Sequence, residues 1–181
     1  EGKVNERDFL DRVDILCSLG YTVMISNYKK YYKLIEYFSQ FTKARMGLIL
    51  GVDTLIEMFE EKYYRNLNGG ILEAFGIIFT RDIKFYLYPY KPNDKTELLN
   101  SNNIPIHPRV KNLYHYLYGN GRIEDLEFNP KVLSIFSRDV LTKIRNCNEG
   151  DWEQQVPDGV AKIIKANSLF GWLCKIPSKK K

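Results

Sequence analysis

The chain has few of the residues that build metal or disulfide sites: among its 181 residues there are two histidines and three cysteines. Cys17, Cys147 and Cys174 are far apart in the sequence, and no two of them have the spacing of a zinc site or a redox dithiol. His107 and His115 are too few and too widely separated for a metal cluster. We therefore predict no metal centre and reduced cysteines, with Cys17 as a small core residue on the apolar face of a helix.

Long hydrophobic runs are also missing. The longest, Met46–Val52, is far shorter than the roughly 20 residues that a membrane-spanning helix needs. No charged start is followed by a hydrophobic stretch, so no secretory signal is visible. We expect an intracellular, cytoplasmic protein with no membrane span. Because the sequence opens at Glu1 without an initiator Met, we also expect a C-terminal fragment that contacts a missing N-terminal part of its chain.

Positive charge is concentrated at one end of the chain. The formal net charge is +5, but Lys175, Lys179, Lys180 and Lys181 account for four of these charges, so the remainder carries 5 − 4 = +1. A nucleic-acid-binding domain needs a basic face, and a nearly neutral body does not supply one. We predict a basic, disordered tail over 175–181 and no nucleic-acid partner.

The first half of the sequence alternates between strand and helix patterns. Apolar runs rich in strand-forming residues predict strands over Tyr21–Ile25, Met46–Leu50 and Ile83–Tyr88, with helical spacing between them. Such alternation is typical of a parallel sheet with crossover helices, so we predict an α/β, Rossmann-like, three-layer core over 1–91. The continuous apolar sequence of the first two strands predicts that they are buried on both faces. The alternation of polar and apolar residues in the third predicts a strand at the edge of the sheet.

The second half shows helical patterns only. The segment 92–108, which contains three of the seven prolines, is predicted to be a poorly packed loop and a boundary. Beyond it, 109–174 is predicted to be a helical extension that packs on the core, because so short a segment buries little surface by itself.

Polar residues or glycine follow each predicted strand. In an open parallel sheet, ligands bind outside the carboxyl ends of the strands. This rule selects Ser26 and Asn27 after the first strand, Gly51 and Asp53 after the second, and Tyr90 after the third. The alternative is structural, because Asn and Asp are also the preferred N-caps of helices.

Asn68, Gly69 and Gly70 stand just before a predicted helix, where free amides and the helix dipole favour a phosphate. The sequence has neither a P-loop nor a GxGxxG motif, and the alternative is a flexible connection between helices. With the strand ends, these residues predict a nucleotide or another phosphate-bearing small molecule as the ligand. The residues identify no cofactor and no catalytic group.

The run Thr22–Asn27 resembles the second motif of the haloacid-dehalogenase phosphatases, a hydrophobic strand that ends in Ser/Thr-Asn. The resemblance covers six residues, and Ser26 is the one residue that carries over. The family's Asp-x-Asp nucleophile motif is missing, because Asp11 and Asp14 fall on a predicted helix. A phosphatase activity would need a nucleophile outside this sequence.

A second resemblance spans most of the chain. It is to a poorly characterised family of bacterial and protist proteins, some of which are labelled nicotinate or nicotinamide nucleotide adenylyltransferases. The segments that carry it are Gly20–Tyr28, Glu61–Tyr64, Gly69–Phe75, Ile135–Val140, Val156–Pro157 and Leu169–Gly171. The resemblance implies a nucleotide ligand, but the triphosphate-binding motifs of true adenylyltransferases are missing, so it assigns no catalytic residue.

These observations leave three hypotheses. The first is an α/β domain that binds a small molecule or nucleotide at the carboxyl edge of its sheet. The second is a non-catalytic interaction or regulatory domain whose aromatic residues and helical half bind a partner. The third is a fragment of a haloacid-dehalogenase-like phosphatase.

Overall fold

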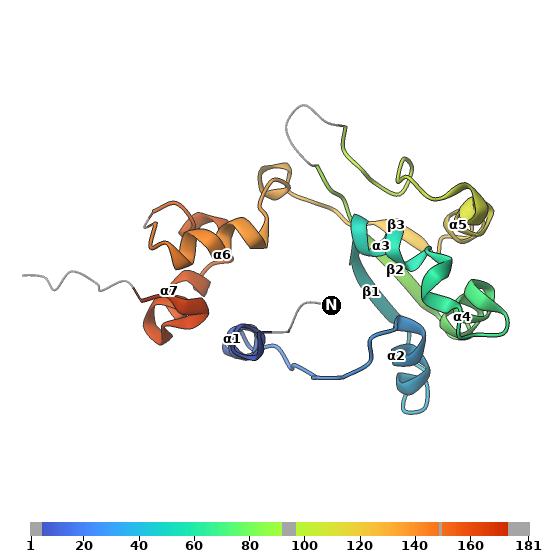
Figure 1. Cartoon of the computed structure of the whole chain (residues 1–181), viewed down its shortest axis with the longest axis horizontal. Helices are drawn as coiled ribbons and strands as arrows, with labels where there is room; N and C mark the ends of the chain where they lie inside the picture. Colours follow the sequence, from blue (N-terminus) through green and yellow to red (C-terminus); the bar gives the residue numbers. More distant parts are fainter. Residues whose placement is uncertain (1–4, 92–96, 149, 174–181) are drawn as a thin grey trace, which may run out of the picture. The chain divides into compact units, whose positions relative to one another are not determined.

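The computed structural model describes residues 5–91, 97–148 and 150–173, and the chain divides into two compact units (Figure 1). The sheet unit is Asn27–Ser134, and the helical unit joins Glu1–Ser26 to Ile135–Lys181. The sequence predicted boundaries at 91, 108 and 174, and these stay predictions. The predicted tail at 175–181 lies outside the described residues.

The sheet unit contains a parallel sheet of three strands in the order β1-β2-β3. The strands are β1 (Met46–Gly51), β2 (Ile83–Tyr88) and β3 (Ile123–Asp125). Met46 pairs with Ile83 and Gly51 with Tyr88, whereas Phe85 pairs with Ile123. The mixed α/β class with a parallel sheet, predicted from the alternation of patterns, is confirmed.

Helical segments precede each strand of this unit. Helix α2 leads into β1; α3, η1 and α4 connect β1 to β2; and η2 and α5 connect β2 to β3. The α-helices are α2 (Tyr31–Phe38), α3 (Val52–Met58), α4 (Gly70–Ile78) and α5 (Lys111–Gly119). The 3-10 helices are η1 (Glu61–Tyr64), η2 (Pro108–Val110) and η3 (Pro130–Val132).

The two faces of the sheet differ in burial. On one face, Leu50, Ile83, Phe85, Leu87 and Ile123 are buried in the same hydrophobic cluster as residues from all four helices. The opposite face carries Gly47, Ile49, Lys84, Tyr86, Tyr88 and Glu124. Ile49 on that face is 72% exposed, so the helices of this unit cover one face of the sheet. The unit has two layers, and the predicted three-layer arrangement is not seen within it.

The strand prediction for Tyr21–Ile25 is wrong. This stretch has no strand assignment, and Tyr21, Met24 and Ile25 are more than half exposed. Strand-forming side chains favour a strand only where a neighbouring strand supplies hydrogen bonds and packing. The third strand of the sheet is instead Ile123–Asp125, which the sequence analysis missed.

The positions of β1 and β2 in the sheet also differ from those predicted. β2, predicted to be an edge because its polar residues alternate, is the central strand. β1, predicted to be buried on both faces, is an edge strand on which Leu48 is half-buried and Ile49 is exposed. Polar and apolar residues alternate along β2 because one face of the sheet is buried and the other is not. The alternation therefore does not indicate where β2 stands in the strand order.

The predicted loop over 92–108 is packed where it is described. Residues 92–96 lie outside the described part, but Tyr90 and Leu99 form an antiparallel bridge with N···O distances of 3.0 and 2.8 Å. Ser101 and Ile104 are buried, at 2% and 8% exposure. The expectation of poor packing is therefore wrong for this part of the segment.

The helical unit consists of α1 (Glu6–Ser18), α6 (Ser137–Arg145) and α7 (Val160–Asn167), with short turns η4 (Glu153–Gln155) and η5 (Leu169–Gly171). Its own hydrophobic cluster includes Trp152 and Trp172, whose ring centroids are 5.5 Å apart. The Asn5 side chain caps α1, accepting from the Arg7 and Asp8 amides.

The prediction for the cysteines is wrong in two respects. Cys17 is exposed, because α1 turns Asp11 and Ile15 inward rather than the face that carries Cys17. Cys147 is disulfide-bonded rather than reduced.

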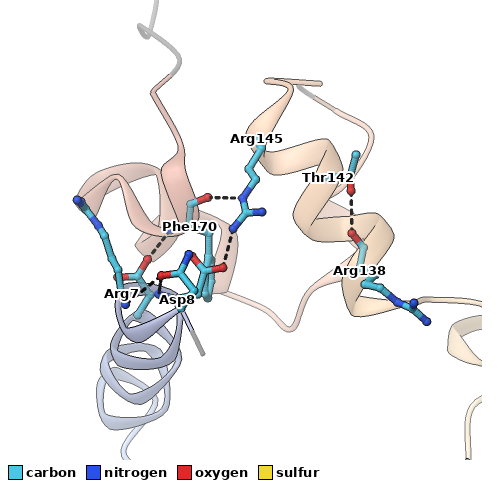
Figure 2. A network of polar contacts seen from close by, with 8 residues as sticks. Arg7, Asp8, Arg138, Thr142, Arg145 and Phe170 are labelled. Carbon is cyan, nitrogen blue, oxygen red and sulfur yellow. Dashed lines mark hydrogen bonds and ion pairs between the residues drawn. The ribbon is translucent and has the colours of Figure 1, made fainter. Parts of the chain in front are cut away.

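Polar contacts hold the two chain segments of the helical unit together (Figure 2). The Arg145 guanidinium pairs with Asp8 at 2.6 Å and donates to the Phe170 carbonyl at 3.4 Å. The buried Asp11 carboxylate accepts from the Phe170 amide at 2.5 Å. Phe170 has a positive φ of 56°, so these contacts hold a backbone conformation that non-glycine residues seldom adopt.

Candidate functional site

The carboxyl edge of the sheet, where the sequence predicted a ligand, brings together only some of the predicted residues. Parallel pairing of Gly51 with Tyr88 places Gly51, Asp53 and Tyr90 at one edge. Ser26 and Asn27 are exposed and follow no strand, so the reason for placing them there no longer holds.

Several polar groups at this edge of the sheet form hydrogen bonds within the protein. Asp125, at the end of β3, accepts from the Ser101 amide at 2.9 Å and from its hydroxyl at 2.6 Å. The Tyr114 hydroxyl donates to the Ser101 carbonyl at 2.7 Å. Burial, and then the nearby Asp125 charge, raises the pKa of Tyr114 well above its ordinary value. The bonds of Asp125 and Tyr114 to Ser101 anchor the segment after β2, so these polar groups serve the fold rather than a ligand.

The predicted phosphate position already has an anionic partner. The Gly69 amide, just before α4, donates to the Glu73 carboxylate at 2.8 Å. A Cβ at Gly69 would lie 2.9 Å from the Glu73 Cβ, so the absence of a side chain at Gly69 permits this contact. A phosphate here would have to displace the carboxylate. We therefore leave Asn68, Gly69 and Gly70 out of the candidate site.

A cleft of about 790 Å³ opens elsewhere in the sheet unit, between the end of α3 with η1 on one side and the segment 105–110 on the other. None of the eight predicted site residues lines it. Its lining residues are Ile56, Phe59, Glu60, Glu61, Lys62, Arg65, Pro105, Ile106, His107, Pro108, Arg109 and Val110.

The floor of the cleft is apolar and fixed. Phe59 is 2% exposed, and its ring packs against Phe75 and Tyr114 at centroid distances of 4.8 and 5.3 Å. Val110 is also buried, and Ile56 and Ile106 pack against the same core. A floor made of core residues keeps its shape without a ligand, which lowers the cost of binding.

The first wall, η1, is tied to the end of α3. The buried Tyr64 hydroxyl donates to the Met58 carbonyl at 2.7 Å, and burial raises the pKa of Tyr64 to about 12. Asn66 donates to the Tyr32 hydroxyl at 3.2 Å, which connects the chain after η1 to α2. These bonds hold the chain on either side of Arg65.

The second wall contains two prolines, Pro105 and Pro108, whose rings restrict the backbone. The imidazole Nδ1 of His107 accepts from the Arg109 amide at 3.3 Å, so the ring caps the turn η2. The other ring nitrogen, Nε2, is not used in that contact.

The rim of the cleft has an excess of positive charge. Lys62 pairs with Glu60, and this hydrogen bond raises the pKa of Lys62. Within the described ranges neither Arg65 nor Arg109 forms an ion pair, and Glu61 is the one other carboxylate in the lining. Planar guanidinium groups bind carboxylate and phosphate oxygens in pairs. The cleft therefore combines an apolar floor with two arginines suited to an anion.

The lining supports binding better than bond-making. It includes no Ser, Thr or Cys that could act as a nucleophile, and His107 is its one imidazole. Among the residues that the structure describes, no three His, Cys, Asp or Glu side chains gather to hold a metal ion.

Comparison with known proteins returns no relative: no family model, no curated protein and no solved structure matches the chain. The two resemblances noted in the sequence therefore stay predictions. Over the described residues, no helix combines the length and apolar character needed to cross a membrane.

Each wall of the cleft lies in or near a segment that was singled out from the sequence, but the sequence did not predict that the two segments line one cleft. The stretch that contains Arg65 ends in Asn68-Gly69-Gly70, and His107 stands in a proline-rich run. The usable signal was the pair Arg65 and Arg109, of which the first stands four residues before Gly69 and the second directly after Pro108. That both line one cleft depends on how η1 and η2 pack on the core, and no local pattern shows that.

Proposed function

We propose that the sheet unit is a binding module for a small organic anion, a phosphomonoester with an aromatic or apolar body such as a nucleoside monophosphate. The observation that carries the proposal is the cleft itself. It places Arg65 and Arg109, neither paired with a carboxylate among the described residues, beside a floor of Phe59, Val110 and Ile106.

The two parts of the cleft match the two parts of such a ligand. The arginines are exposed, so the phosphate binds at the rim, where it keeps some of its water. The apolar body of the ligand packs on Ile56 and Ile106, the half-buried residues of the floor, and contributes about 25 cal/mol per Å² of apolar surface removed from water. Rim charge alone contributes little in water, so both parts are needed.

Calorimetric titration with AMP, adenosine and inorganic phosphate tests the proposal. We expect AMP to bind with a Kd below about 1 mM, which corresponds to roughly 4 kcal/mol, and each separate part to bind more weakly. The double variant Arg65→Gln/Arg109→Gln should weaken AMP binding at least about tenfold, because it removes both guanidinium groups.

The matched control is Arg7→Gln/Arg138→Gln, which removes two positive charges from exposed arginines of the helical unit. It should bind AMP as the wild type does, and circular dichroism should show all variants folded. Equal affinity in the double variant, or no heat with AMP at millimolar concentration, would show that the cleft is not the site.

A further inference from the structure

Strand β1 leaves one side of its backbone without a neighbouring strand. The Met46 amide donates to the Asp82 carbonyl at 3.1 Å, so Met46, and with it Leu48 and Leu50, direct their backbone groups towards β2. Because these directions alternate along a strand, Gly47 and Ile49 direct theirs outward, as does Gly51 at the strand end. In the described part of the chain, no strand pairs with this outer side.

This edge lacks the protection that natural edge strands carry. Such strands are usually short, or contain lysine, proline or a bulge that discourages pairing. β1 runs Met-Gly-Leu-Ile-Leu-Gly, with no charge and no proline, and Ile49 is 72% exposed. The opposite edge, β3, is three residues long and contains Glu124 and Asp125. The contrast identifies the β1 edge as the one suited to strand pairing.

The residues that flank β1 carry opposite charges. Arg45 immediately precedes the strand, Asp53 follows it by two residues, and both are exposed. Arg45 uses Nε to bind Asp82 at 2.6 Å, which leaves its terminal nitrogens for another acceptor. A strand with positive charge before it and negative charge after it is complementary to an antiparallel copy of itself.

We propose that a second copy of this chain pairs with the first along β1, antiparallel, with the two-fold axis at Ile49. In this register Gly47 lies opposite the partner's Gly51, and the end of each strand that follows Arg45 lies beside the end of the partner strand that leads into α3 and Asp53. Each of the three outward residues then faces another outward residue, so about six backbone hydrogen bonds close the junction. The two sheets become one, with the helices of both copies on the same face.

The glycines of β1 keep this edge flat. A Cβ at Gly47 would lie 2.8 Å from the Tyr86 ring, so Gly47 allows that ring to cross over β1. Ile49 is then the one outward residue with a side chain, and at the two-fold axis it meets its own copy. Aliphatic pairs directly opposite each other stabilise an antiparallel junction, and like charges there weaken it.

Sedimentation velocity over a wide range of protein concentration tests the proposal on the full chain. We expect a reversible dimer in the wild type and at least about tenfold weaker dimerisation in Ile49→Lys, which places two like charges at the axis. The control Leu72→Lys adds the same charge at an apolar residue of α4 that is 67% exposed, and it should dimerise as the wild type does.

Crosslinking checks the register. In a Cys17→Ser background, which removes the exposed free thiol, oxidised Ile49→Cys should give a disulfide-linked dimer, because residues opposite each other at the axis are about 5.5 Å apart between Cα atoms. Leu72→Cys should not crosslink. A wild type that stays monomeric, equal dimerisation in Ile49→Lys, or no crosslink in Ile49→Cys would each overturn the proposal.

Discussion

The two units of this protein are assembled from the chain in different ways. The sheet unit is one continuous stretch, Asn27–Ser134, in which neighbouring strands follow each other along the sequence. The helical unit joins the two ends of the chain, and its segments meet through contacts such as Asp8 with Arg145. The strand pairs of the first unit therefore join elements that are neighbours in the sequence, whereas the second unit depends on contacts between residues far apart in the sequence.

The units also provide separate reporters of their stability. Both tryptophans, Trp152 and Trp172, belong to the core of the helical unit. The strands and 33 of the described α-helical residues belong to the sheet unit, but another 30 belong to the helical unit, so far-ultraviolet circular dichroism reports on both units. Tryptophan emission therefore follows the helical unit alone, and any circular dichroism change that does not coincide with it comes from the sheet unit. Each of the next predictions compares these two signals.

The largest effect is expected from Phe85→Ala in the central strand. Phe85 is fully buried and packs against Phe75 and Phe79, so its truncation leaves a cavity and should cost about 3–5 kcal/mol. The circular dichroism midpoint in urea should fall, and the tryptophan midpoint should stay near the wild-type value, because the two hydrophobic clusters are separate. A parallel fall of both midpoints would mean that the units unfold as one.

A smaller effect is expected from Asp11→Ala in the helical unit. This change leaves the buried Phe170 amide without its acceptor, at a cost of about 1–3 kcal/mol. Asp14→Ala, at an exposed position on the same helix, is the control. The tryptophan midpoint should fall in the first variant only; an equal shift in both would show that the contact to Phe170 contributes nothing particular.

The smallest effect concerns pH and Tyr64. Burial raises the folded-state pKa of Tyr64 to about 12 from its ordinary 10.0, so the unfolded chain releases this proton first as the pH rises. The stabilisation is fully present below pH 10 and is lost towards pH 12, with a loss of about 1.4 kcal/mol by pH 11.

Tyr64→Phe removes this group, and its stability should change less between pH 9 and 11 than that of the wild type. Urea titrations followed by circular dichroism at the two pH values measure the difference. An identical pH dependence in both proteins would show that the Tyr64 proton is not linked to the folding of the sheet unit.

The parts of the fold that were predicted from sequence are those whose pattern and position agree. Ile83–Tyr88 was predicted with its observed bounds because turn signals flank a clear period-two pattern. Ile123–Asp125 was missed because three residues are too short to show a period. Tyr21–Ile25 was wrongly predicted, since its side chains favour a strand but no neighbouring strand is present to pair with it.

The candidate site was harder to predict than the fold. The rule for strand ends selected Gly51, Asp53 and Tyr90, which do share an edge, but Asp125 and Ser101 use much of that edge for structure. The cleft depends on the distance between Arg65 and Arg109, which is set by helix packing. Spacing in the sequence carries no information about that distance.

The most direct test of the account locates the ligand. Titrating the isotope-labelled full chain with AMP and following backbone amide shifts distinguishes the cleft from the strand ends. The account predicts changes in both walls, at Glu61–Arg65 and at Ile106–Arg109, with little change at Gly51–Asp53 or Tyr90. Changes confined to Gly51–Asp53 and Tyr90, changes at Gly69–Glu73, or no changes at all would contradict it.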